Sequence, residues 1–417
     1  MVKEKIIFRK EVTMLSVNQP WDKLKTCAVG RSYPPELYDY IENPKVRNLL
    51  EKIAIETEED YQKLIGILEK HNVNVIRTQY RLTEDGKIPK VSGCNVYEKP
   101  PMCPRDDSAM IGNRFFTPGD EMTNWKAILK NQGIEDIPED WDAVRELKET
   151  NKVKYTEIAK IVQTYTCNIQ YPDRVIPIGK EVLYNLKPIV DYVESHGNEV
   201  VRDMNINSAC TLRIGKDLYF GLVHPQLQET TYQKHVEKLF PDYRCHVTSY
   251  SGHTDSVFTA LCPGLIMTVG GGCWGEGVDP DKKYEEEFPG WERVHLENES
   301  WGKMEPWAEL KSKTRGRWWI EGASYESATV DYVDSWMSHW VNYAAETVFD
   351  VNLLMIDRHN AIINSENPVV VKKLEEYGIT PHIFNFRHRY FWDGGIHCIT
   401  LDLDREGDRE DYFPERG

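Results

Sequence analysis

At 417 residues with a formal net charge of −16, the chain is too acidic for us to expect nucleic acid or an anionic membrane surface as a partner. Its 40% hydrophobic and 11% aromatic residues suffice for a large buried core, and neutral or cationic small molecules are easier ligands. The chain has no run of about eighteen apolar residues, so we expect no membrane-spanning helix.

Residues 1–14 read as an N-terminal arm without the apolar run or the small-residue cleavage site of a secretory signal. The nine cysteines are odd in number and scattered, and none forms a CxxC pair. We therefore expect no disulfide framework, no zinc site and a location in the reducing cytoplasm.

A helix followed by a short strand recurs along the chain. In residues 57–78, Thr57 and Asp60 suit a helix N-terminal cap, and apolar residues then follow a helical period. In the last such unit, Asn367 and Pro368 suit the N-cap and first turn of a helix. The other units are residues 186–203, 232–250, 284–297 and 367–386.

Further strand-like runs lie between these units, at residues 23–30, 210–221, 264–271 and 351–364. A generic open α/β sheet is one interpretation, but two or three strands per helix do not suit a strictly alternating doubly wound sheet. Radial repetition around a centre is the other, and it places a site on the axis. We expect one catalytic domain over residues 1–417, with a charged helical insertion at about 133–160 and a charged C-terminal tail at 405–417.

Three stretches carry side chains suited to catalysis, each at the end of a predicted strand or in the loop after it: residues 100–113, 249–271 and 394–398. They contain Arg105, Asp106 and Asp107, then His253 and Asp255, and finally Cys398. In an extended backbone, residues two apart point to the same side, so His253 and Asp255 can face one cavity together.

Each stretch also has a structural interpretation. A cysteine at the start of a strand is commonly a small buried apolar residue, and a run such as PRDD is commonly a solvated turn. His397 is expected to point away from the site and to have a structural or supporting role. The combination of a cysteine, a histidine and two carboxylates, all near loops, favours a catalytic site over these separate explanations.

Several segments together resemble the arginine:glycine amidinotransferase family, in the family's order and over roughly residues 14–405. These segments are SVNQPWDKLKTCAVGRS, MCPRDDSAMIGN, GHTDSVFTALCPGLIM, NLLMIDRHNAIINSENPVVVKKLEEYGI and GGIHCITLDLDREG. The resemblance implies the five-bladed, pseudo-symmetric α/β propeller of guanidine-modifying enzymes, with the active site on its central axis. It also implies a reaction that needs neither a metal nor a cofactor.

Carried over by motif, the resemblance makes Cys398 the nucleophile and His253 the general acid and base. Asp106 and Asp255 would hold the substrate's guanidinium, for which paired carboxylate oxygens are well suited. The implied activity is transfer of an amidino group from arginine, or a related guanidine, to an amine through a covalent amidino-cysteine, with release of ornithine. The remaining substrate-binding candidates are Arg105, Asn207 and Asp350.

The chain departs from the family's pattern at the residue that orients the catalytic histidine. Where the family has an acidic residue, this chain offers Asn207 and Cys210. Asn207 can hold an imidazole by a hydrogen bond but does not stabilise an imidazolium as an anion does. The nearest acidic alternatives are Asp203 and Asp217, and the sequence does not choose between them.

A second departure concerns the far end of the substrate. The family has an arginine after the strand that matches residues 265–269, whereas this chain reads GGGCWGEG, and Asp350 stands where the family tends to have a small polar residue. An anion there repels a carboxylate and favours an ammonium group, so we expect a donor or acceptor other than the arginine–glycine pair.

Two other functions stay open from the sequence. One is a guanidine hydrolase like arginine deiminase, in which water takes the place of the amine. The other is a catalytically weakened member kept as a scaffold, which the missing carboxylate motivates. The expected partners are a small-molecule guanidine donor and an amine acceptor, and a homodimer is left open.

Overall fold

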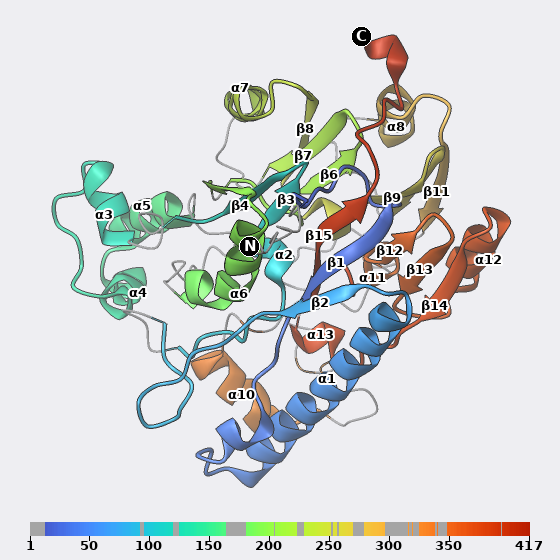
Figure 1. The fold of residues 1–417 in the computed structure, drawn as a ribbon. Helices are drawn as coiled ribbons and strands as arrows, with labels where there is room; N and C mark the ends of the chain where they lie inside the picture. The colour runs from blue at the N-terminus through green and yellow to red at the C-terminus, as the bar shows by residue number, and fades with distance from the viewer. Residues whose placement is uncertain are drawn as a thin grey trace, which may run out of the picture.

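Within the described part of the chain, the strands form five separate three-stranded sheets. Figure 1 shows how these strands and the helices are arranged. The structure is a computed structural model, and it describes residues 13–91, 96–119, 125–163, 181–203, 205–222, 229–251, 253–256, 258–269, 279–296, 316, 319, 325–337, 340, 348–392 and 394–417. Every sheet repeats one pattern, in which two strands pair antiparallel and a third strand pairs in parallel with the middle one. The fold is therefore a five-bladed α/β propeller, as predicted, and not an open sheet.

Four blades follow one another in the sequence, and in each the third strand is reached through a helix, because a parallel pair needs a long crossover. The second blade holds β3 (Ala109–Ile111), β4 (Arg114–Thr117), α6 (Glu181–Ser195) and β5 (Glu199–Arg202). The third holds β6 (Thr211–Ile214), β7 (Asp217–Leu222), α7 (Glu229–Leu239) and β8 (Arg244–Ser251). The fourth holds β9 (Phe258–Cys262), β10 (Leu265–Val269), α8 (Pro280–Glu287) and β11 (Glu292–Leu296). The fifth holds β12 (Leu354–Asp357), β13 (Asn360–Ile363), α12 (Pro368–Glu376) and β14 (Thr380–Ile383).

The first blade joins the two ends of the described chain. Strand β1 (Lys23–Val29) pairs antiparallel with β15 (Thr400–Glu406), from Lys23 opposite Glu406 to Val29 opposite Thr400. Helix α1 (Pro44–Lys70) then leads to β2 (Asn74–Arg77), which pairs in parallel with β1. The last strand of the chain thus closes the ring that the first strand begins.

All five predicted helix–strand units are present, but the predicted start of the first helix is wrong. Helix α1 begins at Pro44, where the side chain of Asn43 accepts a hydrogen bond from the Lys45 amide. Thr57 and Asp60 lie inside this helix, fully buried, and bind the segment around residues 387–392 instead of capping it. The predicted cap of α12 is confirmed, because Asn367 accepts from the Val369 amide and Pro368 follows it.

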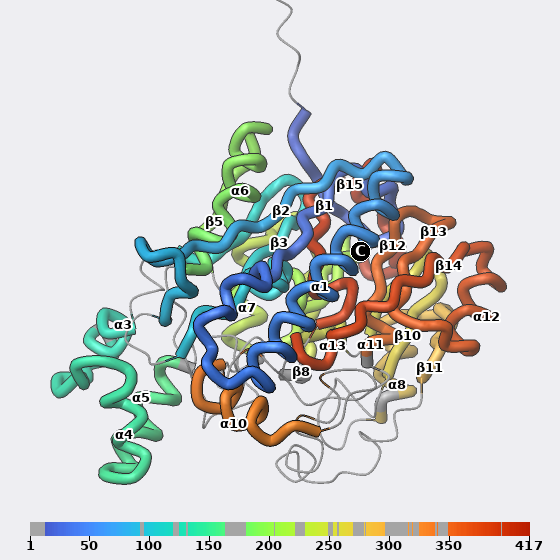
Figure 2. Tube along the Cα trace, turned by 90° about the horizontal axis from the view of Figure 1, so that it is seen from below, coloured from blue at the N-terminus to red at the C-terminus, as the bar shows by residue number. Residues whose placement is uncertain are grey.

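The predicted insertion is helical. Three helices, α3 (Trp125–Asn131), α4 (Trp141–Thr150) and α5 (Lys152–Gln163), stand apart from the five sheets in Figures 1 and 2. They share a small apolar core of their own, which includes Trp125, Trp141 and Ile158. This segment follows β4 and precedes α6, so it enlarges the second blade without interrupting a strand pair.

The C-terminal segment is described to its last residue, whereas the first residues of the chain are not. Residues 1–12 of the predicted N-terminal arm lie outside the described residues. The predicted charged tail begins inside β15, and Phe413 in it is buried beside Trp291. Arg416 donates hydrogen bonds to Asp217 and to the Tyr219 hydroxyl, so the tail is packed on the body. Within the described part of the chain, no helix is both long and apolar enough to cross a membrane.

Candidate active site

Chemically competent side chains converge from all five blades, each from the segment just before a blade's first strand. These segments are the turn at 394–399 before β15, α2 (Pro104–Asp107) before β3, residues 207–210 before β6, the 3₁₀ turn η4 (Thr254–Ser256) before β9, and Asn352 before β12. The first strands contact one another across the centre, β15 with β3 and β6 with β9. The candidate residues thus precede these strands, and His253 and Asp255 also lie in the loop that follows β8, as the sequence suggested.

Cys398 lies in the turn before β15 and is 5% exposed. Its sulfur is 3.8 Å from Oδ2 of Asp255 and 3.1 Å from Nδ2 of Asn352, which donates to it. A side chain at Gly394 would place its Cβ 3.0 Å from the sulfur of Cys103 and 3.3 Å from Cβ of Cys398, so these neighbours would have to move by a few tenths of an ångström. The turn is therefore packed tightly around the sulfur.

The charges around Cys398 oppose its ionisation. Burial raises the pKa of this thiol well above its usual value, and the negative charges of Asp255 and Asp106 raise it further. A thiol without a cation beside it is therefore largely protonated at neutral pH. A cation that entered between the sulfur and these carboxylates would reverse the effect.

Asp255 is buried in η4 and is held as an anion. Its Oδ2 accepts a 2.7 Å hydrogen bond from Nδ1 of His397. Burial alone would raise its pKa, but this hydrogen bond and nearby positive charge outweigh burial and lower the pKa below its ordinary value. Among the described residues, Oδ1 of Asp255 has no hydrogen-bond partner, so one buried carboxylate oxygen remains for a ligand.

His397 was expected to point away from the site, and this expectation is wrong. Residues 396–399 form a turn and not an extended strand, so neighbouring side chains do not alternate between two faces. The ring reaches Asp255, which itself lies beside Cys398. Burial lowers the pKa of His397 to about 4, with the positive charge of Arg105 acting in the same direction. The ring is therefore neutral at pH 7, and Nδ1 carries the proton that it donates to Asp255.

His253 and Asp106 lie on the more open side of the site. Nδ1 of His253 is 3.9 Å from Oδ1 of Asp106, and their side chains are 29% and 23% exposed. Burial, together with the charge of Asp255, raises the pKa of Asp106. For Asp107, burial and the charge of Asp106 raise the pKa to about 7. His253 and Asp255 do face one centre, although the backbone between them is a 3₁₀ turn and not a strand.

Arg105 was predicted to bind substrate, but its guanidinium is engaged with other parts of the protein. Its side chain is fully buried, and Nε donates to the carbonyl oxygens of His397 and Thr400 at 2.7 and 2.9 Å. Nη2 binds the buried carboxylate of Asp402 at 2.9 Å. Arg105 therefore holds the turn that contains Cys398 in place.

The carboxylate of Asp402 gathers two further buried arginines. Arg213, from β6, donates to both of its oxygens at 2.8 and 3.0 Å, and Nε of Arg405 donates at 2.9 Å. Burial opposes ionisation of Asp402, but the three arginines outweigh it and hold its pKa well below the usual range. This ion cluster ties β15 to α2 and β6 directly beneath Cys398 and was not anticipated from the sequence.

The two acidic alternatives predicted to orient His253, Asp203 and Asp217, are bound to other residues. Asp203 is bound to His235 at 2.8 Å and to the Asn205 amide, and Asp217 is bound to Arg244, His246 and Arg416. Asn207 is buried, and its Oδ1 accepts from the Cys210 amide at 2.9 Å.

Asp350 lies in α11 (Val348–Val351), two residues before Asn352. Its two carboxylate oxygens accept hydrogen bonds from Ser365 at 2.8 Å and from Asn367 at 2.7 Å. Both donors are neutral side chains. The GGGCWGEG stretch that follows β10 lies outside the described residues.

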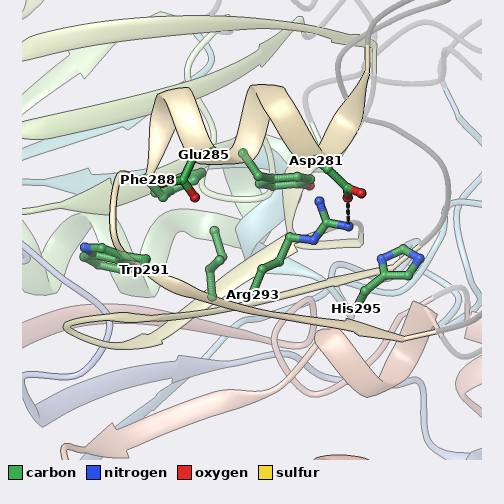
Figure 3. Close-up of a pocket in the computed structure, with 8 residues that line it drawn as sticks. Asp281, Glu285, Phe288, Trp291, Arg293 and His295 are labelled. Atoms are coloured by element: carbon green, nitrogen blue, oxygen red, sulfur yellow. Dashed lines mark ion pairs between the residues drawn. The ribbon is translucent and has the colours of Figure 1, made fainter.

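Two hollows in the described structure can be placed relative to the candidate site. A cavity of about 20 Å³ lies behind Asp255 and His397, against Arg213, and it has room for one water molecule but not for a substrate. A hollow of about 370 Å³ lies between α8 and β11, where Arg293 pairs with Asp281 at 2.5 Å and stacks on Tyr284 (Figure 3). None of its lining residues belongs to the candidate site.

The described residues hold no group of three or more His, Cys, Asp or Glu side chains placed to bind a metal ion. Sequence reasoning missed Asn352 as well as His397. The available signal was weak, since Asn352 is only the first residue of a segment that carried the family resemblance.

Comparison with known proteins agrees with this architecture. No protein-family model matches the chain. Mitochondrial glycine amidinotransferase of Gallus gallus is 23% identical over 431 residues, which covers 97% of this chain and 86% of that protein. The L-arginine:L-lysine amidinotransferase of Pseudomonas savastanoi pv. phaseolicola is 22% identical over 235 residues, which covers 54% of this chain and 52% of that protein.

Two solved structures share the fold over nearly the whole chain. An amidinotransferase of the saxitoxin biosynthetic pathway from Microseira wollei has a TM-score of 0.55 at 14% identity, covering 96% of this chain and 99% of that one. Inosamine-phosphate amidinotransferase from Streptomyces griseus has a TM-score of 0.52 at 16% identity, with the same coverage. The chain is thus similar in sequence to amidinotransferases, to one of them along nearly its whole length, and it shares the propeller fold of two solved amidinotransferases.

Proposed function

We propose that the protein transfers the amidino group of arginine, or of a related guanidine, to an amine through a covalent amidino-Cys398, and that it releases ornithine when arginine is the donor. The observation that carries the proposal is the buried sulfur of Cys398, 3.8 Å from the Asp255 carboxylate. Asp106, from α2, and His253, two residues before Asp255, support the proposal because their side chains lie 3.9 Å apart and Asp106 acts electrostatically on Cys398.

The electrostatics of this centre favour a guanidinium as the ligand. A guanidinium is planar and permanently charged, and carboxylates bind it through paired hydrogen bonds. Asp255 is ionised and has a carboxylate oxygen left for such a bond. A guanidinium bound between Asp106 and Asp255 would neutralise the two charges that disfavour the Cys398 thiolate. Substrate binding would thus generate the nucleophile.

The chemical steps then follow from the residues present. The thiolate of Cys398 attacks the central guanidinium carbon, and the C–N bond to the ornithine amine breaks as His253 donates a proton to that nitrogen. An amidino-thioether remains on the sulfur. The acceptor amine, deprotonated by His253, attacks the same carbon, and the C–S bond breaks to release the new guanidine and the thiolate. Asp106 and Asp255 hold the planar group throughout.

We further propose that the acceptor, or the far end of the donor, is cationic and not a simple amino acid carboxylate. Asp350 supports this, because it is two residues from Asn352 and a carboxylate there favours an ammonium group over a carboxylate. One relative is named for lysine as the second substrate, and another is named for glycine. A panel of amines decides between them, and glycine as the best acceptor would refute the cationic preference.

The central test is detection of the covalent intermediate by intact mass. Incubation with arginine should add the mass of one amidino group to the wild-type protein and none to Cys398→Ala. A chase with amines should remove the adduct and yield the matching guanidines. Release of citrulline or urea without any dependence on added amine would indicate a hydrolase. Failure of arginine and a panel of other guanidines to form the adduct would indicate a scaffold.

A further inference from the structure

Asn352 is a buried, neutral side chain that contacts the sulfur of Cys398, and neither the reaction steps nor the family resemblance gives it a role. It lies between α11 and β12, and its amide makes four hydrogen bonds. Oδ1 accepts from the amides of His397 and Cys398 at 3.0 and 3.2 Å. Nδ2 donates to the Cys398 sulfur at 3.1 Å and to the Asp255 carbonyl oxygen at 3.3 Å.

The orientation of this amide is fixed by its partners. Two backbone N–H groups can be accepted only by the amide oxygen, and the Asp255 carbonyl can only accept from the amide nitrogen. Turning the amide over would set N–H against N–H and oxygen against oxygen. The N–H group is therefore directed at the sulfur on chemical grounds.

The surroundings of the amide are shaped to keep it there. A Cβ at Gly395 would lie 2.4 Å from Oδ1 of Asn352, so only glycine at 395 leaves room for it. From the end of β13, Asn364 donates to the carbonyl oxygens of Asn352, at 2.8 Å, and of Phe349. Asn352 is thus held at both its backbone and its side chain.

We propose that Asn352 is a positioning residue that fixes the nucleophile turn and donates the hydrogen bond that stabilises the thiolate form of Cys398. A neutral sulfur is a weak acceptor, whereas an anionic acceptor strengthens a hydrogen bond about twofold. Three other groups facing the sulfur favour the thiol: Asp255 from η4, and Asp106 and Cys103 from α2 and its start. A backbone hydrogen bond with Gly395 acts in the opposite direction and favours the thiolate. Among the contacts made by described side chains to this sulfur, the amide of Asn352 favours the thiolate.

The inference rests on the proposed role of Cys398 as nucleophile. Its test is chosen so that a failure of the inference about Asn352 can be told apart from a failure of the proposed function. Trypsin should release residues 390–405, YFWDGGIHCITLDLDR, in which Cys398 is the sole cysteine. Alkylation by iodoacetamide over a range of pH, followed by mass spectrometry of this peptide, therefore titrates the Cys398 thiol alone. Amidino transfer is not needed for this measurement.

Two substitutions remove the donor. Asn352→Asp keeps an oxygen for the two backbone amides and the size of the side chain, and Asn352→Ala leaves no polar group at all. In both we expect the apparent pKa of the thiol to rise by about one to two pH units, and alkylation at neutral pH to slow by about 10- to 100-fold. Asn364→Ala is the matched control, since it loosens the same segment without removing the donor to sulfur, and its titration should match the wild type.

An unchanged titration of Cys398 in Asn352→Ala, with a native circular dichroism spectrum, overturns the inference. If that variant does not fold, an unchanged titration of Cys398 in Asn352→Asp overturns the inference instead. An equal rise in Asn364→Ala also overturns it, because the effect would then be structural. If Asn352 variants titrate as expected but the wild type forms no adduct with arginine, the inference stands and the proposed function fails.

Discussion

The buried carboxylate of Asp402 offers the sharpest test of how the site is held together. It lies in β15, four residues after Cys398, and is surrounded by three buried arginines. The change Asp402→Asn keeps the shape of the side chain but removes its charge and one acceptor oxygen. Three guanidinium groups then remain in the interior without an anion.

The expected cost follows from the contacts. Asp402 accepts hydrogen bonds of 2.8 to 3.0 Å from Arg105, Arg213 and Arg405, and asparagine can keep only those that reach its one oxygen. Removing one partner of a buried ion pair costs about 3–5 kcal/mol. We therefore expect a loss of about 4 kcal/mol. With an unfolding entropy of about 2 cal/mol/K per residue, this lowers the Tm of a chain this long by about 5 °C.

The pH dependence has a defined sign. Since the folded pKa of Asp402 lies well below the unfolded value of about 3.9, its charge stabilises the fold at all pH values above about 4. That contribution is lost as the pH falls through the depressed folded pKa. The gap in Tm between wild type and Asp402→Asn should therefore be constant from pH 5 to 7 and narrow below about pH 4.

Differential scanning calorimetry measures this gap, and Asp404→Asn is the matched control on the same strand. Asp404 is half-buried, accepts a 3.1 Å hydrogen bond from the Ser16 amide, and has its pKa raised by burial. Its replacement by asparagine should leave Tm unchanged or slightly higher at pH 7. Equal Tm values for the two variants would refute the view that the arginine cluster depends on Asp402.

The remaining predictions concern the substrate and the helices. His397→Ala removes the 2.7 Å hydrogen bond that keeps Asp255 ionised, so KM for arginine should rise about tenfold or more in steady-state assays, with a smaller change in kcat. Asp107, with a pKa of about 7, gains charge as pH rises from 6 to 8; wild-type KM for a guanidine should fall over this range, and Asp107→Asn should flatten the profile. Gly66→Ala, inside α1 with no atom within 4 Å of the new Cβ, should stabilise the protein by about 1 kcal/mol in thermal unfolding.

The architecture could be predicted because its signals are local. Helical and strand periods are properties of neighbouring residues, and all five helix–strand units appear where the pattern indicated. The predicted start of α1 was wrong because a capping pattern is short and recurs by chance. Thr57 and Asp60 have the right residue types for a cap, but tertiary contacts with Trp392 and Arg387 determine their place.

The supporting half of the site could not be predicted, because it depends on contacts between distant residues. Arg105 and Asp402 are separated by 297 residues in the sequence, and nothing local to either indicates the pair. The misplacement of His397 has a different cause. The alternation of a strand was extended into residues that form a turn, and a turn rotates each side chain differently.

The pairing of β1 with β15 has a consequence for molecules that are damaged or incompletely folded. The same strand that completes the ring carries, at its entry, the turn with the reactive sulfur. A molecule that has opened along this seam would lose the carboxylate-lined centre and would also expose the edge of β1, which invites pairing with other chains. The candidate site and the closed ring of blades would thus be lost together. An opened molecule would be inactive and prone to aggregation or proteolysis.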